Sequence, residues 1–367
     1  YTVQHADSRK TEALYDSDFT FGLATVSLGA AADEARALHV FAHGTLLLSG
    51  YSDQGDFDFA LVKLMADGDL DTSFHTDGKV TTAIGSEHDI INAMVVDTSG
   101  SYVVVGRAKE YNVDWAIARY LSSGILDTSF FTSGKRIHSF WDNTDIARAV
   151  ALETDGRLVV GGYSWLFGRY IFAVARYTTA GLFDTSFHTD GRNTFLASTS
   201  DSGVLSILRQ TNGDFLYAGP IHSGVNWDFG MMRLSSDGQL DTTFGTSGIV
   251  TRPVLSADEK NYSIAQQPSG RFLFGGYSDN SSELDVAVVA LLSDGSLDTS
   301  FSTSGKLTHS ITNAKNDVGY AVKIGVGDSF IVGGYTVNAS DNNDFAVSRY
   351  LSDGRFDTSF HTDGKYS

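Results

Sequence analysis

The stretch Leu70-Asp71-Thr72-Ser73-Phe74-His75-Thr76-Asp77-Gly78-Lys79 recurs along the whole chain. A degenerate copy opens at Asp16, and close copies open at Asp127, Asp184, Asp241, Asp298 and Asp357. The opening aspartates of successive copies are 55, 56, 57, 57, 57 and 59 residues apart. A fixed period of this length is typical of solenoids, propellers and arrays of repeats.

Each period contains four short segments that have the pattern of β-strands. Examples of the first to the fourth segment are residues 145–151, 157–163, 114–120 and 78–82. They are rich in β-branched and aromatic residues and are bounded by Gly, Asp and Ser, which is typical of strands joined by tight turns. No long stretch has the helical period, so we predict an all-β protein.

The first segment of the period occurs six times, near residues 35–39, 90–95, 146–151, 202–207, 262–266 and 318–323. A four-stranded antiparallel unit repeated every ~40–50 residues is typical of a β-propeller blade. We therefore predict a single domain, residues 1–367, that forms a six-bladed β-propeller of four-stranded antiparallel blades. Its repeats span about 16–70, 71–126, 127–183, 184–240, 241–297 and 298–356, and residues 357–367 form a partial repeat.

The two ends of the chain compete for one strand position. Residues 20–28 have the pattern of an outer strand with no blade before it, and residues 364–367 begin another outer strand. The sixth blade has one vacancy for such a strand. We predict that the N-terminal strand closes the ring and that the last residues pack beside it or trail.

Three motifs carry a resemblance to a known family. They are the D-x-x-F-x-x-x-G-K signature, the sequence DGRLVVGG at residues 155–162 and the sequence DFAVSRY at residues 344–350. Over residues 16–365 the chain resembles the delta-60 repeat family, bacterial β-propellers of unknown function. The resemblance implies a secreted or surface protein, and it transfers no catalytic residue.

Charge and composition exclude several classes of function. The formal net charge is -18, and such a surface repels nucleic acids and anionic lipids. With no cysteine, the chain has no disulfide, thiolate metal site or cysteine nucleophile. No apolar run approaches the ~18 residues of a membrane span. No signal peptide is visible from Tyr1 onward, which fits a sequence that starts after a cleavage point. We expect an extracellular, cell-surface or periplasmic location.

An acidic residue opens the first strand of every repeat, and six such residues would lie near one mouth of a propeller channel. They are Asp33, Asp89, Asp145, Asp201, Glu259 and Asp317. Carboxylate oxygens suit Ca²⁺, the only cofactor that the sequence suggests. The alternative is that each carboxylate caps the turn that enters its strand.

The loops between the second and third strands differ from one repeat to the next, and variable loops on a rigid scaffold often carry binding function. We predict that they bind a glycan or a protein partner, and the alternative is local packing on the blades. The candidate ligand-binding residues are Trp165, Phe167, Tyr170, Trp227, Asn226 and Asn280.

Three further patterns have structural interpretations. We predict that the D-T-S-F motif locks a turn and that its Phe plugs between blades. His75, His188 and His361 each lie two residues before an Asp; such pairs suit a transition metal or, alternatively, a solvated loop. Third-strand pairs such as Asp58 with Lys63 are predicted to form salt bridges between neighbouring blades, since positions five apart face opposite sides of a strand.

The sequence contains no catalytic motif, which favours a protein without enzymatic activity. We therefore predict no catalytic residue. We predict an exported or cell-surface binding or adhesion module that recognises a glycan or protein partner through the loops of one propeller face. One alternative is a carbohydrate-active hydrolase that uses acids near the channel mouth. Another is a structural spacer or tip of a larger surface assembly.

Overall fold

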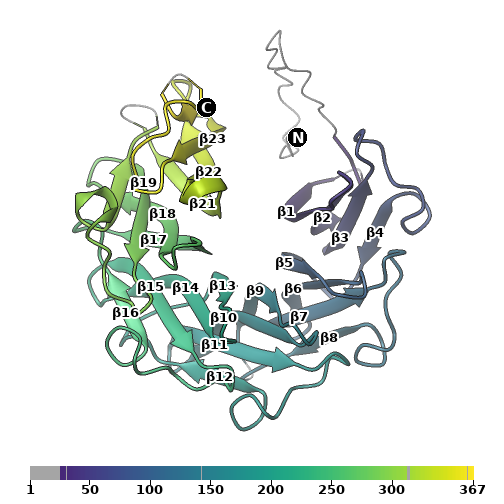
Figure 1. Ribbon diagram of the computed structural model, residues 1–367. Helices are drawn as coiled ribbons and strands as arrows, with labels where there is room; N and C mark the ends of the chain where they lie inside the picture. The colour runs from purple at the N-terminus through teal and green to yellow at the C-terminus, as the bar shows by residue number, and fades with distance from the viewer. Residues whose placement is uncertain (1–24, 30, 142, 312–314, 362) are drawn as a thin grey trace. The chain divides into compact units, whose positions relative to one another are not determined.

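The protein, in a computed structural model, is described over residues 25–29, 31–141, 143–311, 315–361 and 363–367. These residues form six four-stranded antiparallel sheets, and their only helical elements are the single turns η1 (Phe301–Thr303) and η2 (Val326–Asp328) (Figure 1). The predicted fold class is confirmed: the chain is an all-β, six-bladed β-propeller with four antiparallel strands in each blade. No helix among the described residues has the length and apolar character that crossing a membrane requires.

The chain is divided into two compact units. Unit 1 comprises Tyr1–Val160 and Arg176–Phe183, and unit 2 comprises Gly161–Ala175 and Asp184–Ser367. The first two sheets belong to unit 1, the last three belong to unit 2, and the third contributes residues to both.

The strands follow the order expected for blades. The first sheet consists of β1 (Asp33–Val40), β2 (Leu46–Asp53), β3 (Phe57–Leu64) and β4 (Lys79–Thr82), and the second of β5 (Ile90–Val96), β6 (Tyr102–Lys109), β7 (Val113–Tyr120) and β8 (Lys135–His138). The third consists of β9 (Asp145–Leu152), β10 (Leu158–Leu166), β11 (Arg169–Tyr177) and β12 (Arg192–Phe195). In every sheet the strands are hydrogen-bonded in sequence order.

Three further sheets complete unit 2. The fourth consists of β13 (Ser206–Arg209), β14 (Phe215–His222), β15 (Trp227–Leu234) and β16 (Ile249–Arg252). The fifth consists of β17 (Glu259–Gln266), β18 (Phe272–Asp279), β19 (Leu284–Leu291) and β20 (Lys306–His309). The sixth consists of β21 (Asp317–Ile324), β22 (Phe330–Val337), β23 (Asn343–Tyr350) and β24 (Lys365–Tyr366).

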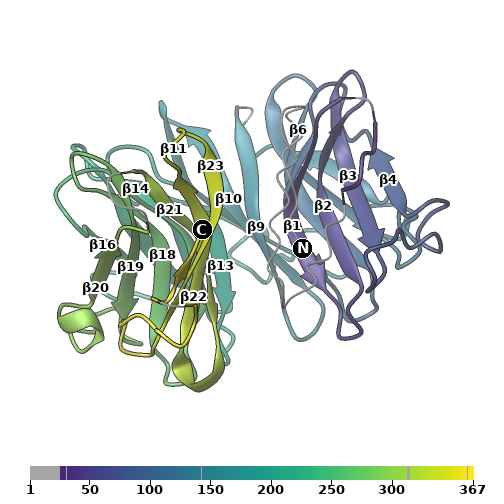
Figure 2. The same cartoon turned by 90° about the horizontal axis from the view of Figure 1, so that it is seen from above.

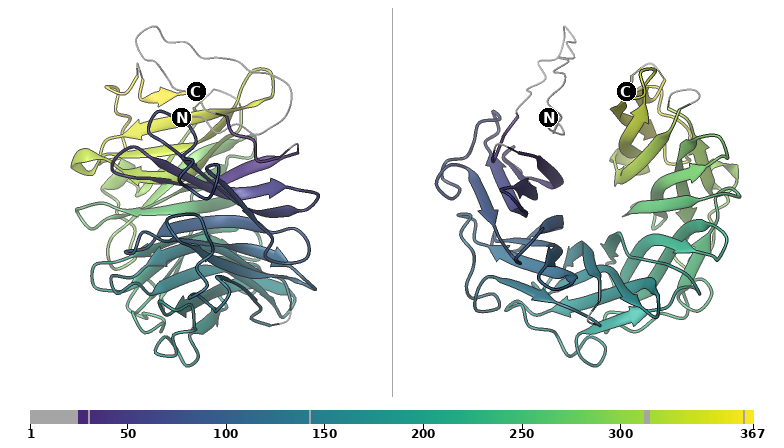
Figure 3. Two further views of the ribbon diagram at one scale, coloured as in Figure 1. Left: turned by 90° about the vertical axis from the view of Figure 1, so that its right-hand side faces the viewer. Right: turned by 180° about the vertical axis from the view of Figure 1, so that it is seen from behind.

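Apolar side chains bury themselves between consecutive sheets of a unit. In unit 1 the first and second sheets lie next to each other (Figure 3), and Leu47, Phe59, Ile91 and Val104 form one cluster of fully buried residues. In unit 2, β18 and β19 lie next to β21 of the following sheet (Figure 2). The core of this protein is therefore a series of layers between blades, which follows from strands that are apolar on both faces.

A β-bulge interrupts the first strand of four sheets at the same place. The pairing shifts between Ala35 and Ala37, between Ile91 and Ala93, between Asn261 and Ser263 and between Gly319 and Ala321. A bulge inserts one extra residue and bends the strand. The extra residues are Arg36, Asn92, Tyr262 and Tyr320, and these four positions are the bulge positions.

The bulge explains the Gly-Gly pair that recurs in the second strand. A Cβ atom on Gly276 would lie 1.9 Å from the carbonyl oxygen of Lys260, and one on Gly334 would lie 1.8 Å from that of Val318. Both distances are far shorter than any van der Waals contact, so only glycine fits opposite the bulge.

At the chain ends, the structure differs in part from the prediction. The outer strand of the sixth sheet is β24, in which Lys365 and Tyr366 pair with Ser348 and Val347. The last residues therefore form a strand instead of trailing. Of the N-terminal strand predicted to close the ring, residues 20–28, the first five residues lie outside the described residues. Residues 25–29 are described without strand pairing, and Val26 and Leu28 pack against Leu46, Val62 and Leu64 of the first sheet.

Candidate functional site

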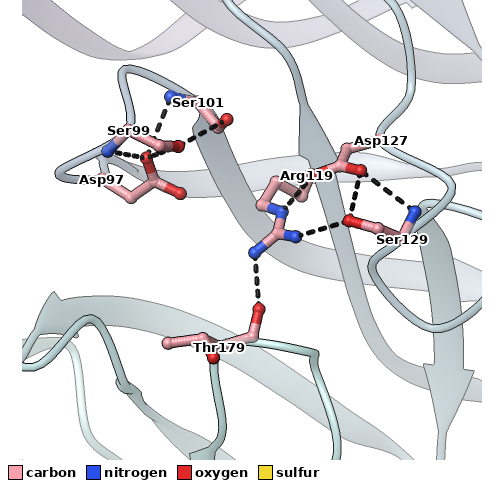
Figure 4. Close-up of polar contacts among 7 residues, drawn as sticks. All are labelled: Asp97, Ser99, Ser101, Arg119, Asp127, Ser129 and Thr179. Atoms are coloured by element: carbon pink, nitrogen blue, oxygen red, sulfur yellow. Dashed lines mark hydrogen bonds and ion pairs between the residues drawn. The ribbon is translucent and has the colours of Figure 1, made fainter.

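The D-T-S-F motif forms a hydrogen-bonded clasp at the end of the third strand. At the end of β7 in the second sheet, Asp127 Oδ1 accepts hydrogen bonds from the Ser129 N–H at 3.0 Å and from Ser129 Oγ at 2.6 Å, and Asp127 Oδ2 accepts one from Arg119 Nε at 2.8 Å (Figure 4). Arg119 Nη1 also donates to the carbonyl oxygen of Thr179, in the turn that follows β11 of the third sheet, at 2.6 Å. The clasp therefore orders its own turn and, through Arg119, is hydrogen-bonded to a turn of the next sheet.

In five clasps the Phe packs against a turn of the next sheet, as predicted. Phe130, which follows the second sheet's third strand, is fully buried, and a Cβ atom on Gly181 of the third sheet would lie 3.0 Å from its ring. The Phe131 N–H donates to the carbonyl oxygen of Ala180. Phe74, Phe187, Phe244 and Phe301 are fully buried in the same way. The motif is a structural joint between repeats within each unit.

The basic residues of the third strand do not form the predicted salt bridges between blades. They pair with the opening Asp of the clasp at the end of their own strand, as in Lys63–Asp71 at 3.1 Å and Arg119–Asp127 at 2.8 Å. The chain folds back after the third strand, so the Asp127 N–H donates to the carbonyl oxygen of Arg119. The alternation of side chains along a single strand does not predict this reversal of the chain.

The histidines of the clasp lie in turns at the surface. His75 and His361 are exposed and have positive φ angles of 55° and 52°. His361 Nδ1 lies 4.0 Å from Asp363 Oδ1. Within the described residues, no group of three or more His, Cys, Asp or Glu side chains could hold a metal ion.

The acidic residues that open the first strands accept hydrogen bonds from the connection that precedes them. Asp89 Oδ2 accepts from the N–H groups of Ile84 and Gly85, at 2.6 and 2.9 Å. Asp33 accepts from Leu28, Asp145 from Phe140, Glu259 from Val254 and Asp317 from Ile311. Asp201 accepts instead from the N–H of Tyr170. These contacts have the geometry of the capping role that the sequence allowed.

Several of these acids are buried, which changes their chemistry. Asp89, Asp145, Glu259 and Asp317 have no exposed surface. Burial raises the pKa of Asp89 and Glu259, although the N–H groups that they bind oppose the rise. Two surface hollows, lined by residues such as His75 and Ile125 and by residues such as His361 and Tyr366, contain none of the six acids. Asp89 and Glu259 therefore have raised pKa values but no exposed surface, whereas Asp58, whose pKa burial also raises, is half-buried.

The predicted loop residues of the third repeat form one aromatic group. The Trp165 and Tyr170 rings lie 4.8 Å apart and the Tyr163 and Tyr170 rings 4.9 Å apart, both with edge-to-face geometry. Phe167 is 80% exposed at the tip of the two-residue turn between β10 and β11. Tyr170 therefore packs locally, while Phe167 faces solvent.

The other predicted loop residues contact neighbouring strands and loops. Trp227 lies under the Lys260 ammonium, whose Nζ is 4.7 Å from the ring centroid. Asn226 Nδ2 donates to the carbonyl oxygen of Ser256 at 2.7 Å, and Asn280 Nδ2 donates to Asp285 Oδ2 at 2.8 Å. Within the described residues, Trp165 and Trp227 share no ring contact, so the predicted residues form separate groups.

A second aromatic group, the tyrosine cluster, lies in unit 2 on β17, β18, β21 and β22. It consists of Tyr262, Tyr277, Tyr320 and Tyr335. Ring centroids are 6.1 Å apart for Tyr262–Tyr277, 4.9 Å for Tyr262–Tyr320 and 5.9 Å for Tyr320–Tyr335. Tyr320 is 50% exposed and the other three side chains are half-buried. The four rings therefore form a partly exposed, partly desolvated aromatic group.

The sequence analysis missed this cluster although its signals were present. Tyr277 and Tyr335 follow the Gly-Gly pair of the second strand, and Tyr262 and Tyr320 occupy bulge positions. Alternation along a regular strand would place the bulge residues on the wrong face. The sequence signal for the cluster is a Gly-Gly-Tyr segment in the second strand of a repeat whose first strand also contains a Tyr.

Sequence comparison agrees with the class that the sheets define, a β-propeller repeat protein. A family model described as "Domain of unknown function (DUF5122) beta-propeller" matches residues 44–74, 98–130, 153–187, 210–244, 267–301 and 329–360. These segments cover more than half of the chain. The chain therefore belongs to the DUF5122 beta-propeller family, whose function is unknown. No curated protein sequence matches it.

Solved structures show distant similarity. Sqt1 from Chaetomium thermophilum is 13% identical with a TM-score of 0.42, over 88% of this chain and 82% of that one. Drosophila Semaphorin 2a is 9% identical with a TM-score of 0.49, over 87% and 67%. A PL25 ulvan lyase is 10% identical with a TM-score of 0.42, over 86% and 78%. At these scores none of them supports a function for this chain.

Proposed function

We propose that this protein is a non-catalytic module that binds a glycan, and that the tyrosine cluster is the contact surface. The observation that carries the proposal is the grouping of four tyrosine rings from four strands at centroid distances of 4.9–6.1 Å, with Tyr320 half exposed. Sugar rings have apolar C–H faces and polar edges. Tyrosine offers a matching apolar face and a hydroxyl group.

The position of the cluster supports a binding role. β17 and β21 are edge strands of their sheets, and β17, β18 and β21 pack side by side in unit 2 (Figure 1). A surface built on strands is held more rigidly than one built on loops, so binding orders few side chains. Phe167 and Trp165 offer a further aromatic contact on the third repeat.

The enclosed acids favour binding over hydrolysis. Glycoside hydrolysis needs two carboxyl groups on either side of an accessible sugar bond. The acids with raised pKa values here include Asp89 and Glu259, which have no exposed surface and accept hydrogen bonds from backbone N–H groups. We therefore assign them a structural role and propose no catalytic residue.

A glycan array with purified protein tests the proposal. We expect binding by the natural protein and at least about a tenfold loss of affinity in Tyr320→Ala, because the variant removes the most exposed ring of the cluster. Tyr111→Ala is the matched control, since Tyr111 is 95% exposed in unit 1. A parallel array in chelator tests whether calcium contributes to binding. Absence of binding on every array would overturn the proposal in favour of a protein partner or a spacer role.

Two narrower statements belong to the same proposal. We propose an extracellular, cell-surface or periplasmic location, supported by the acidic, cysteine-free composition; fractionation of the producing cells tests it. The more specific resemblance to the delta-60 repeat remains a prediction, supported by the signature at residues 71–79.

A further inference from the structure

We infer that the glycan bound by the tyrosine cluster carries protonated amino groups, as a hexosamine polymer without N-acetyl groups does. The inference rests on the proposed function of the cluster and names the chemical class of its ligand. Three observations carry it: the acids beside the cluster, the cation that occupies the equivalent place in unit 1, and the net charge of the chain.

Two carboxylates lie beside the cluster. Asp279 follows Tyr277 by two residues on β18, so both side chains are on the same face of the sheet. The Asp279 N–H donates to the carbonyl oxygen of Asp258 at 2.9 Å, which places Asp258 next to it. Asp258 is exposed and Asp279 is half-buried. An ammonium group that reached the rings would therefore meet negative charge as well.

One tyrosine of the cluster responds to that charge. Burial, followed by the nearby negative charges of Asp258 and other groups, raises the pKa of Tyr277 to about 12. The Tyr277 phenol is therefore neutral at neutral pH, and its ring face is available for a cation–π contact.

Unit 1 contains a cation at the equivalent place. Tyr51 holds the position on β2 that Tyr277 holds on β18, and the guanidinium carbon of Arg36 lies 5.6 Å from the Tyr51 ring centroid. Arg36 occupies the bulge position that Tyr262 occupies in the fifth sheet. At the bulge position beside this tyrosine, the first sheet has a cation, Arg36, and the fifth sheet has a second aromatic ring, Tyr262. Lys260, on the same strand as Tyr262, places its ammonium over Trp227.

Charge complementarity selects among glycans. A net charge of -18 repels uronate and sulfate groups. A neutral glycan can stack on the rings but gains nothing from the two carboxylates. A protonated hexosamine uses both, through cation–π contact and through ion pairing with Asp258 and Asp279.

The test compares two tetrasaccharides of equal length, β-linked N-acetylglucosamine and β-linked glucosamine. We expect the glucosamine tetramer to bind about tenfold more tightly by isothermal titration calorimetry at low salt, and the preference to shrink in 0.5 M salt, roughly as for other exposed ion pairs. In the double variant Asp258→Asn and Asp279→Asn the preference should be lost. Asparagine can still accept the bonds that Trp227 N–H and Ser281 N–H donate, so the loops keep their contacts.

The outcomes separate this inference from the proposed function. Asp53→Asn is the matched control, since Asp53 ends β2 as Asp279 ends β18 and accepts a bond from Gly55 N–H. Equal binding of the two tetramers, weakened in both cases by Tyr320→Ala, would overturn the inference alone. A preference for glucosamine that survives the double asparagine variant would also overturn it. Loss of all binding to both tetramers and to the array would overturn the proposed function as well.

Discussion

The first two sheets, in unit 1, and the last two, in unit 2, differ in the side chains at the same backbone positions. The bulge positions hold Arg36 and Asn92 in unit 1, where Arg36 Nη1 donates to Asn92 Oδ1 at 3.1 Å. They hold Tyr262 and Tyr320 in unit 2, where the rings lie 4.9 Å apart. The bulge residues of unit 1 are therefore polar and hydrogen-bonded to each other, whereas those of unit 2 are aromatic.

The difference shows how a repeat protein separates stability from recognition. Strand register, the bulge and the glycine opposite it recur, because each sheet must pack against the next. The bulge residue itself is an extra one that lies outside the register, so its side chain is free to vary. Four predictions follow this comparison, from the largest expected effect to the smallest.

The first prediction contrasts a clasp residue with a cluster residue of unit 2. Phe244→Ala should lower the free energy of unfolding by about 3–5 kcal/mol, since Phe244 is fully buried against Gly295 of the next sheet. Tyr320→Ala should cost less than about 1 kcal/mol, because half of the side chain is already in water. Urea unfolding of both variants measures the two losses. Equal losses would remove the distinction between joint and surface.

The second prediction concerns His309 of the fifth sheet, a half-buried histidine in ring contact with Tyr350 and Phe356. Burial, with a contribution from the Lys365 charge, lowers the pKa of His309 from 6.5 to about 3, and His309 Nδ1 lies 2.7 Å from Tyr350 Oη. The unfolded chain takes up a proton below pH 6.5 and the folded chain does not, so this contribution to stability falls as the pH drops. We expect a loss of about 3 kcal/mol between pH 7 and pH 4 from this group.

A pair of variants isolates that effect. His309→Thr introduces the residue found at the same place on β4, where Thr82 pairs with Phe59 as His309 pairs with Val286. Its unfolding free energy should depend less steeply on pH than that of the natural protein. His361→Thr, at an exposed clasp position, should leave the slope unchanged. Identical slopes for all three proteins would show that His309 titrates normally.

The third prediction exchanges the two surfaces. Tyr262→Arg combined with Tyr320→Asn gives unit 2 the bulge residues of unit 1. We expect glycan affinity to fall by about tenfold or more while the free energy of unfolding changes by less than about 1 kcal/mol. The matched control is Arg36→Tyr with Asn92→Tyr in unit 1, which should leave affinity unchanged. An exchange that unfolds unit 2 would mean that the rings are part of its core.

The fourth prediction tests the ion pair of the clasp. Asp127→Asn should cost about 1 kcal/mol at neutral pH, since asparagine keeps the bonds from Ser129 but loses the charge opposite Arg119. Burial acts to raise the pKa of Asp127, but the bonds from Ser129 and the Arg119 charge outweigh it, and the pKa is lowered. The contribution is therefore present above the ordinary pKa of 3.8 and is lost as the pH falls below it. Asp155→Asn, at an exposed turn, is the control.

Much of the architecture could be predicted from the sequence because the pattern of one blade occurs six times in the chain. The strands, the turns and the burial of Phe74 and its counterparts follow from local pattern and from the repetition of that pattern. The partner of Arg119 could not be predicted in the same way. Alternation describes the two faces of one strand, whereas Asp127 reaches Arg119 through a chain reversal.

The candidate site was harder to predict. Aromatic side chains in variable loops suggest binding, which predicts a role for Trp165, Tyr170 and Trp227. In the structure these residues contact neighbours in their own or adjacent loops and strands. The tyrosine cluster draws on two first strands and two second strands of successive sheets. No spacing in the sequence places Tyr277 near Tyr320.

The sequence by itself determined the class of the fold, the number of blades and the position of each turn, because these depend on residue periodicity and on turn chemistry that neighbours cannot override. Only the tertiary structure decided which side chains share a surface. A bulge reverses the alternation of the strand that follows it, and packing between sheets then brings Tyr262, Tyr277, Tyr320 and Tyr335 together while it encloses Asp89 and Glu259.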